Sequence, residues 1–183
     1  MVDKCELSAV KEQKTFTFKK ITQEDVPLLQ TWFKEPHVQQ WWPIPTEHEV
    51  LEHFLKRIRS KDTFGYIVKL DENPIAYIQY YYIDRTQEKA GSWLPTDLPM
   101  TTVGTDQFIG DPHYLGKGYG TLFIKEFIKY LTNIEPTITT IILDPDPANI
   151  AAIKCYEKVG FKKVGEFTTA HGSHVLMRYD LKK

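Results

Sequence analysis

The sequence predicts a single α/β domain. Short runs rich in β-branched and aromatic residues alternate along the chain with segments whose apolar residues recur every three or four positions. With 183 residues, of which 42% are hydrophobic, the chain is long enough to bury a core without disulfides or metals. No internal repeat or low-complexity linker divides it. We therefore expect one domain over residues 15–183, preceded by a polar extension over residues 1–14.

The first third of the chain predicts one strand and two helices. Residues 15–21 alternate as a strand does, and Thr22 followed by Asp25 is typical of a helix N-terminus, with the helix ending near Lys34. A proline-rich loop over residues 36–45 follows, and then a second helix. The apolar side of that second helix consists of Val50, Leu51, Phe54, Leu55 and Ile58.

The middle of the chain predicts three strands. Residues 63–70 and 75–82 are β-branched and aromatic, and the turn residues 71–74 between them indicate an antiparallel hairpin. Residues 85–102 form a long irregular insertion, which in a compact domain is more often functional than idle. Residues 103–109 are the next expected strand.

The last third predicts helix, strand, helix and two strands. An amphipathic helix starts at Tyr119, a short buried strand covers residues 139–143, and Gly160 ends a second helix. The two final strands lie around Val164 and over residues 175–181. The apolar face of the first helix is predicted to be Leu122, Phe123, Phe127, Tyr130 and Leu131, and that of the second Ala152, Ile153, Tyr156 and Val159.

Charge and composition favour a small-molecule partner. The 23 basic and 24 acidic residues nearly cancel and form no long run of one sign, which argues against nucleic acid or an anionic membrane surface as partner. No stretch approaches the roughly 20 apolar residues of a membrane span, and the first residues lack the apolar core of a signal peptide. Two cysteines far apart give no disulfide framework. We expect a cytoplasmic monomer or homodimer.

A glycine-rich turn precedes the helix that starts at Tyr119. Gly116, Gly118 and Gly120 let a phosphate approach the backbone closely, and Lys117 adds positive charge. The spacing excludes a nucleotide P-loop, which needs Ser or Thr directly after the lysine, and the dinucleotide fingerprint G-x-G-x-x-G. Taken alone, a glycine cluster of this kind favours a flexible turn that binds no ligand.

A second block, residues 149–161, follows the turn after about thirty residues. The two blocks, in this order and separation, resemble the acetyl-CoA-binding motifs of the GCN5-related N-acetyltransferase (GNAT) superfamily. This resemblance implies a central mixed sheet flanked by helices, whose fourth and fifth strands separate to admit the pantetheine arm, with acetyl-CoA as co-substrate. The cofactor-binding residues that it implies are Phe108, Ile109, Leu115, Gly116, Lys117, Gly118, Tyr119, Gly120, Thr121, Asn149 and Ala152.

Asp106 and Tyr156 are the candidate catalytic residues. Acetyl transfer to an amine needs a group that accepts the amine's proton, and a carboxylate inside the apolar strand 103–109 is a candidate base. The alternative is that Asp106 bonds local backbone donors or only holds a substrate cation. By the resemblance, Tyr156 serves the departing thiolate; the alternative is an aromatic core residue with a polar tip.

Other reactive side chains carry less weight. Cys155 is adjacent to Tyr156 and points about 100° away from it on a helix, so we interpret it as a structural thiol. His48 and His53 are one residue too far apart for the zinc-protease pattern, and we expect no metal site. His171 and His174 flank an expected hairpin turn, which predicts that both are exposed to solvent.

At finer grain the chain resembles the aminoglycoside 6'-N-acetyltransferases, over residues 16–181. This implies a small-molecule amine as acceptor. Asp144 is then a drug-holding carboxylate, although two nearby prolines make a plain turn residue nearly as good an interpretation. The paired tryptophans either wall the acceptor pocket or clasp the loop to the core. A siderophore precursor or other metabolite amine is the alternative acceptor, and a catalytically silent acyl-CoA sensor is the alternative to an enzyme. The expected substrate-binding residues are Trp41, Trp42, Trp93, Asp97, Asp106 and Asp144.

Overall fold

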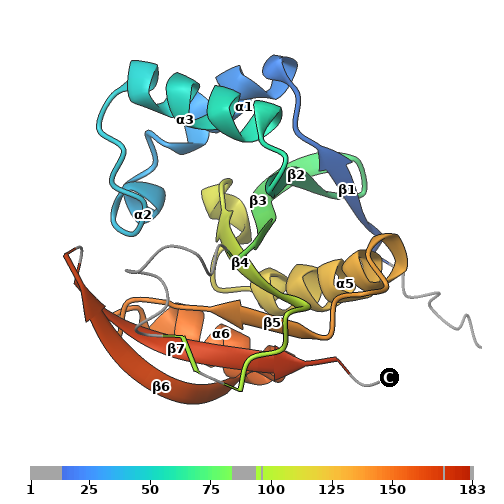
Figure 1. Ribbon diagram of the computed structural model, residues 1–183. Helices are drawn as coiled ribbons and strands as arrows, with labels where there is room; N and C mark the ends of the chain where they lie inside the picture. Colours follow the sequence, from blue (N-terminus) through green and yellow to red (C-terminus); the bar gives the residue numbers. More distant parts are fainter. Residues whose placement is uncertain (1–13, 84–93, 96, 171, 182–183) are drawn as a thin grey trace, which may run out of the picture.

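In the part of the chain that the structure describes, seven strands form one mixed sheet in the order β1-β2-β3-β4-β5-β7-β6 (Figure 1). The structure is a computed structural model that describes residues 14–83, 94–95, 97–170 and 172–181. Among the strands of the described residues, only β4 and β5 run parallel to each other, and every other neighbouring pair is antiparallel. The strands are β1 (Phe16–Lys20), β2 (Thr63–Leu70), β3 (Asn73–Tyr82), β4 (Thr102–Ile109), β5 (Thr140–Leu143), β6 (Lys162–Thr169) and β7 (Gly172–Asp180).

Helices cover both faces of the sheet. A 3-10 turn (Gln23–Asp25) leads into α1 (Val26–Trp32), followed by α2 (Pro36–Gln39) and α3 (Glu47–Arg59); later in the chain come α5 (Tyr119–Ile134) and α6 (Ile150–Val159). Figure 1 shows α1 and α3 at the top of the view, α2 lower on the left, and β6 and β7 at the bottom. The predicted mixed sheet flanked by helices is therefore confirmed.

Two apolar clusters hold the layers together. The larger one joins the inner face of α5 and α6 to one face of the sheet, through residues such as Phe123, Phe127 and Ile141. The smaller one packs α1 and α3 against Ile67 and Tyr77 on the opposite face. A third, small cluster lies around Ile142, Leu176 and Leu98.

The helix starts follow local sequence rules. Thr22 and Asp25 form the expected capping box, and Thr46 with Glu49 forms another at the start of α3. Gly160 ends α6 with a positive φ of 124°.

Three details differ from the sequence prediction. The predicted proline loop contains the one-turn helix α2, because Pro36 suits the first helical position. β3 begins at Asn73 rather than residue 75, because Asp71 and Glu72 both adopt left-handed conformations and close a two-residue hairpin turn. Leu122 is 48% exposed instead of lying on the apolar face of α5, which Ile124 and Ile128 complete.

Among the described residues, no helix has the length and apolar character needed to cross a membrane. In the same part of the chain, no three His, Cys, Asp or Glu side chains gather in a way that would hold a metal ion.

Candidate active site

The sheet opens between its two parallel strands. β4 pairs with β5 only at its start, where Thr102, Val103 and Gly104 face Thr140, Ile141 and Ile142 (Figure 1). β4 then continues to Ile109, while β5 ends at Leu143. Beyond Gly104, the edge of β4 that faced β5 offers its backbone groups to a ligand. The predicted separation of the fourth and fifth strands is present in the described structure.

The glycine turn brings uncapped amides to the start of α5. Gly116 and Gly118 have φ angles of 68° and 82°, a conformation that glycine adopts without strain. A Cβ added to either residue would meet no atom within 4 Å. Gly118 is the N-cap of α5 and provides no side-chain hydrogen bond, in contrast to the capped start of α3. The first amides of α5 and the positive end of its dipole therefore suit a diphosphate.

Gly120 and Thr121 have a packing role as well. A Cβ at Gly120 would lie 3.2 Å from Cys155 Sγ, and Thr121 Oγ1 lies 3.4 Å from the same sulfur. These contacts set the close approach of α5 and α6. Burial raises the pKa of the Cys155 thiol, so this group stays protonated and is a poor nucleophile.

Asn149 caps α6. Its Oδ1 accepts a 3.1 Å hydrogen bond from the backbone N–H of Ala152. This is a normal N-cap contact. It gives both residues a local structural role, and their predicted contact with acetyl-CoA stays a prediction.

Asp106 lies half-buried on β4, beyond the point where pairing with β5 ends. Its Oδ2 accepts a 2.7 Å hydrogen bond from Gln79 Nε2 on the neighbouring strand β3. Burial raises the pKa of the Asp106 carboxyl, and the bond from Gln79 and the charge of Arg57 only partly oppose this. A carboxylate with a raised pKa is a better base than a free aspartate.

Tyr156 approaches the same opening from the other face of the sheet. Gln107, next to Asp106 on β4, points to the opposite face and donates a 2.7 Å hydrogen bond to the Tyr156 hydroxyl. The tyrosine is 8% exposed, and burial raises its pKa, so the phenol is neutral. Because Gln107 is the donor, the phenol proton is free to point elsewhere. Gln107 Oε1 is buried without a hydrogen-bond partner in the described part of the chain.

A second carboxylate interacts electrostatically with Asp106. Asp144 directly follows β5, and burial, with the negative charge of Asp106 second, raises its pKa to about 6. His174 opposes this shift: its Nδ1 lies 3.5 Å from Asp144 Oδ2. The His174 ring also stacks on Phe167, at 5.0 Å between ring centroids. The prediction that His174 is exposed is therefore wrong, because β7 places it against the end of β5; His171 lies outside the described residues.

The predicted acceptor-binding residues divide into separate groups. Trp42 packs edge-to-face against Phe33, Phe108 and Tyr77, which agrees with the alternative that it holds the loop to the core. Trp41 is half-buried. Asp97 Oδ2 accepts a 2.8 Å bond from Arg178 and is not brought to the Asp106–Asp144 pair. Trp93 lies outside the described residues.

Two residues predicted to contact the cofactor, Phe108 and Ile109, already have partners within the protein. The ring of Phe108 belongs to the aromatic cluster under α1 and α3. The carbonyl of Ile109 is bonded to His37 Nε2 at 2.9 Å. Any contact of Phe108 with the co-substrate would therefore use its backbone.

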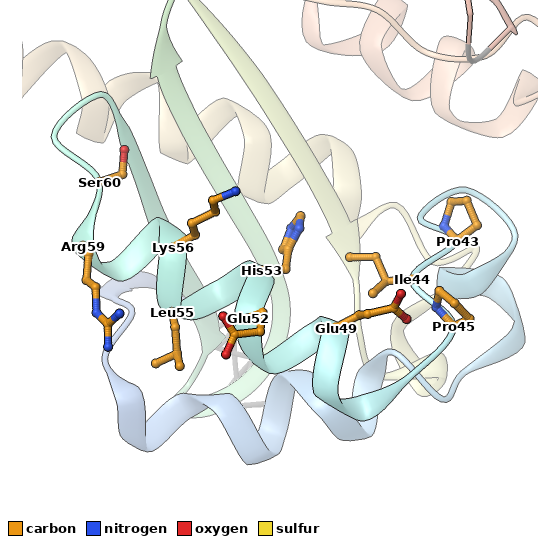
Figure 2. A pocket seen from close by; sticks show the side chains of 10 residues that line it. All are labelled: Pro43, Ile44, Pro45, Glu49, Glu52, His53, Leu55, Lys56, Arg59 and Ser60. Atoms are coloured by element: carbon orange, nitrogen blue, oxygen red, sulfur yellow. The ribbon is translucent and has the colours of Figure 1, made fainter.

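A separate hollow of about 610 Å³ lies along α3 and the loop that precedes it (Figure 2). None of the three residues Asp106, Asp144 and Tyr156 lines it, so it is distinct from the opening between β4 and β5. Its lining carries both signs of charge. The residues that form it are Pro43, Ile44, Pro45, Glu49, Glu52, His53, Leu55, Lys56, Arg59 and Ser60.

One site residue that the sequence analysis missed could have been found from its local pattern. Gln79 is a polar residue in the middle of an apolar strand, as Asp106 is, and is 2% exposed. Arg57 and His174 carry no such local signal, because their partners are distant in sequence.

Comparison with protein families agrees with this geometry. Residues 22–169 match the model described as "Acetyltransferase (GNAT) domain". The chain belongs to the GNAT acetyltransferase family. It is therefore an acetyl-CoA-dependent acetyltransferase.

Individual relatives of this GNAT protein are aminoglycoside-modifying enzymes. The aminoglycoside N(6')-acetyltransferase type 1 of Klebsiella pneumoniae is 32% identical over 166 residues, which cover 88% of this chain and 81% of the relative. The crystal structure of the aminoglycoside acetyltransferase AAC(6')-Ib in complex with coenzyme A and kanamycin superposes with a TM-score of 0.79. It is 32% identical, and the match covers 91% of this chain and 95% of that one.

Proposed function

We propose that this GNAT acetyltransferase transfers the acetyl group of acetyl-CoA to an amino group of an aminoglycoside, at the 6' position, by direct attack in a ternary complex. The observation that carries this proposal is the pair of carboxylates, Asp106 and Asp144, at the opening between β4 and β5. Two negative groups at one opening suit a polycationic amine. The two relatives described above, each matched over most of this chain, are named as aminoglycoside acetyltransferases.

The co-substrate is held along the opening. The amides at the start of α5 bind the diphosphate, and the free edge of β4 bonds the pantetheine amides. A ligand N–H directed at Gln107 Oε1 would also satisfy that buried oxygen. The thioester then lies between Asp106 on one face of the sheet and Tyr156 on the other.

The reaction uses these two residues in different roles. As the amine nitrogen forms its bond to the acetyl carbon, Asp106 accepts the proton that the nitrogen loses. The C–S bond breaks, and the electron pair leaves with sulfur. The neutral Tyr156 hydroxyl donates a hydrogen bond to that thiolate, since its own acceptor site is already filled by Gln107. Asp144 holds a second cationic group of the acceptor.

A panel of amines tests this proposal. Thiol release from acetyl-CoA is measured with an aminoglycoside that carries a 6'-amino group, with its 6'-hydroxyl counterpart, and with hydroxylated lysine-like and polyamine acceptors. We expect turnover with the 6'-amino compound and none with the 6'-hydroxyl one. Turnover confined to the lysine-like acceptors would favour a metabolite acyltransferase, and tight acetyl-CoA binding with no turnover on any amine would favour a sensor.

A further inference from the structure

The side-chain amide of Gln79 has only one possible orientation. Its Oε1 accepts a 2.6 Å hydrogen bond from Arg57 Nε and a 2.9 Å bond from the Tyr77 hydroxyl. A guanidinium can only donate, so the Gln79 atom that faces it must be the oxygen. The amide nitrogen is thereby turned toward Asp106 Oδ2, 2.7 Å away. The network runs from α3 through β3 to the catalytic candidate on β4.

The surrounding fold is built to hold this network. Gly65 on β2 pairs with Gln79, and a Cβ at Gly65 would lie only 2.4 Å from the Tyr77 hydroxyl oxygen. A glycine is therefore required at residue 65 to leave room for that hydroxyl. Gln79 is 2% exposed and Tyr77 is fully buried. Buried polar side chains with all partners in place are rigid, because every alternative orientation loses a hydrogen bond.

We propose that Gln79 and Arg57 are positioning residues for Asp106, which fix its carboxylate so that Oδ2 is held and Oδ1 faces the acceptor amine. This inference rests on the proposed role of Asp106. The amide stands between the guanidinium and the carboxylate, which keeps Arg57 from bonding Asp106 directly. A direct Arg–Asp pair would stabilise the charged carboxylate and weaken it as a base.

Several titratable groups face Asp106 and bear on its proton affinity. These are Arg57 from α3, Tyr77 and Tyr81 on β3, Asp144 after β5 and Tyr156 from α6. Burial raises the pKa of all three tyrosines, so they remain neutral around pH 7. Asp144 and Asp106 are coupled, so the acid limb of a pH–rate profile reports the pair. A test of the network therefore includes the Asp144→Asn background, where only one of the two carboxyls titrates.

The variants Gln79→Leu and Arg57→Met, with Arg59→Met as matched control, test the proposal. Arg59 lies two residues later on α3 and is exposed. For Gln79→Leu we expect kcat to fall at least about tenfold while KM for acetyl-CoA stays within about twofold. The acid limb of kcat/KM should move to higher pH, also in the Asp144→Asn background, because Asp106 has lost the donor that stabilises its charge. Arg57→Met should act in the same direction and less strongly, and Arg59→Met should match the parent protein.

A double variant separates action through Gln79 from independent effects. If Arg57 positions Asp106 through the amide, Arg57→Met should leave kcat unchanged once Gln79 is already leucine. The acid limb should still move to higher pH in that background, because the charge of Arg57 also acts directly on Asp106. Thermal unfolding of each variant shows whether it folds, and Arg57→Met alone gives the test if Gln79→Leu does not. An unmoved acid limb and unchanged kcat in folded variants, with Asp106→Asn strongly impaired, would overturn the positioning role. Full activity of Asp106→Asn would instead remove the proposed role of Asp106 itself.

Discussion

Replacement of Gly118 by alanine separates the cost to the fold from the cost to co-substrate binding. Gly118 has a φ of 82°, and a Cβ there would meet no atom within 4 Å. The substitution therefore costs backbone strain alone, about 1–2 kcal/mol for a non-glycine residue in the left-handed region. In a chain of this size, each kcal/mol lowers Tm by about 2–4 °C.

Gly118→Ala should also weaken acetyl-CoA binding, and this loss is separate from the cost of the strain to the stability of the fold. The added methyl group lies beside the first amides of α5, where it excludes a diphosphate from close contact. A hydrogen bond to a charged group contributes about 1.5–3 kcal/mol. Loss of one such bond weakens binding at least about tenfold, since 1.4 kcal/mol corresponds to a factor of ten.

Isothermal titration calorimetry with acetyl-CoA, combined with thermal unfolding, measures both effects. Gly172→Ala is the matched control, because Gly172 also has a positive φ, of 126°, and open space at its Cβ, but lies at the start of β7 away from the turn. We expect the control to lose stability and keep its Kd for acetyl-CoA. Equal Kd values for the two variants would refute the assignment of the diphosphate to this turn.

Three further predictions follow from the site and its surroundings. Tyr156→Phe should lower kcat on the order of a hundredfold in steady-state assays and leave a folded protein; an unfolded product would support a core role. Acceptor KM should rise as pH falls through about 6, where Asp144 becomes protonated; this dependence should be absent in Asp144→Asn, and its persistence there would exclude Asp144. Burial lowers the pKa of His53 to about 4, so its neutral form stabilises the fold above pH 6.5 and this contribution is lost as pH falls through 4. Because the ring is partly exposed, we expect this contribution to the free energy of unfolding to be about 1–2 kcal/mol. Urea unfolding at several pH values should show a steeper loss of stability at acid pH than in His53→Phe, and parallel curves of stability against pH would contradict this prediction.

Local patterns predicted most of the fold because local physics decides it. The turn residues 71–74 predicted the hairpin, Thr22 and Asp25 predicted the start of the first helix, and Gly160 predicted the end of α6. The one-turn helix that begins at Pro36 was not predicted, because four residues are too few to show a helical period.

The candidate site was predicted in part for the same reason. Asp106 and Tyr156 stood out within recognisable motifs, and the structure brings both to the opening between β4 and β5. Arg57 and His174 were not predicted, because the role of each depends on a partner that is distant in sequence and is brought near by the fold. The partner of Arg57 is Gln79, and that of His174 is Asp144. Such pairings depend on tertiary packing, which a periodic pattern does not encode.

A crystal structure with coenzyme A is the most direct test of the central claim. We expect the diphosphate on the amides of residues 116–120, the pantetheine arm between β4 and β5, and the sulfur within hydrogen-bond reach of the Tyr156 hydroxyl. A coenzyme bound elsewhere, or with its sulfur remote from both Tyr156 and Asp106, would contradict the account.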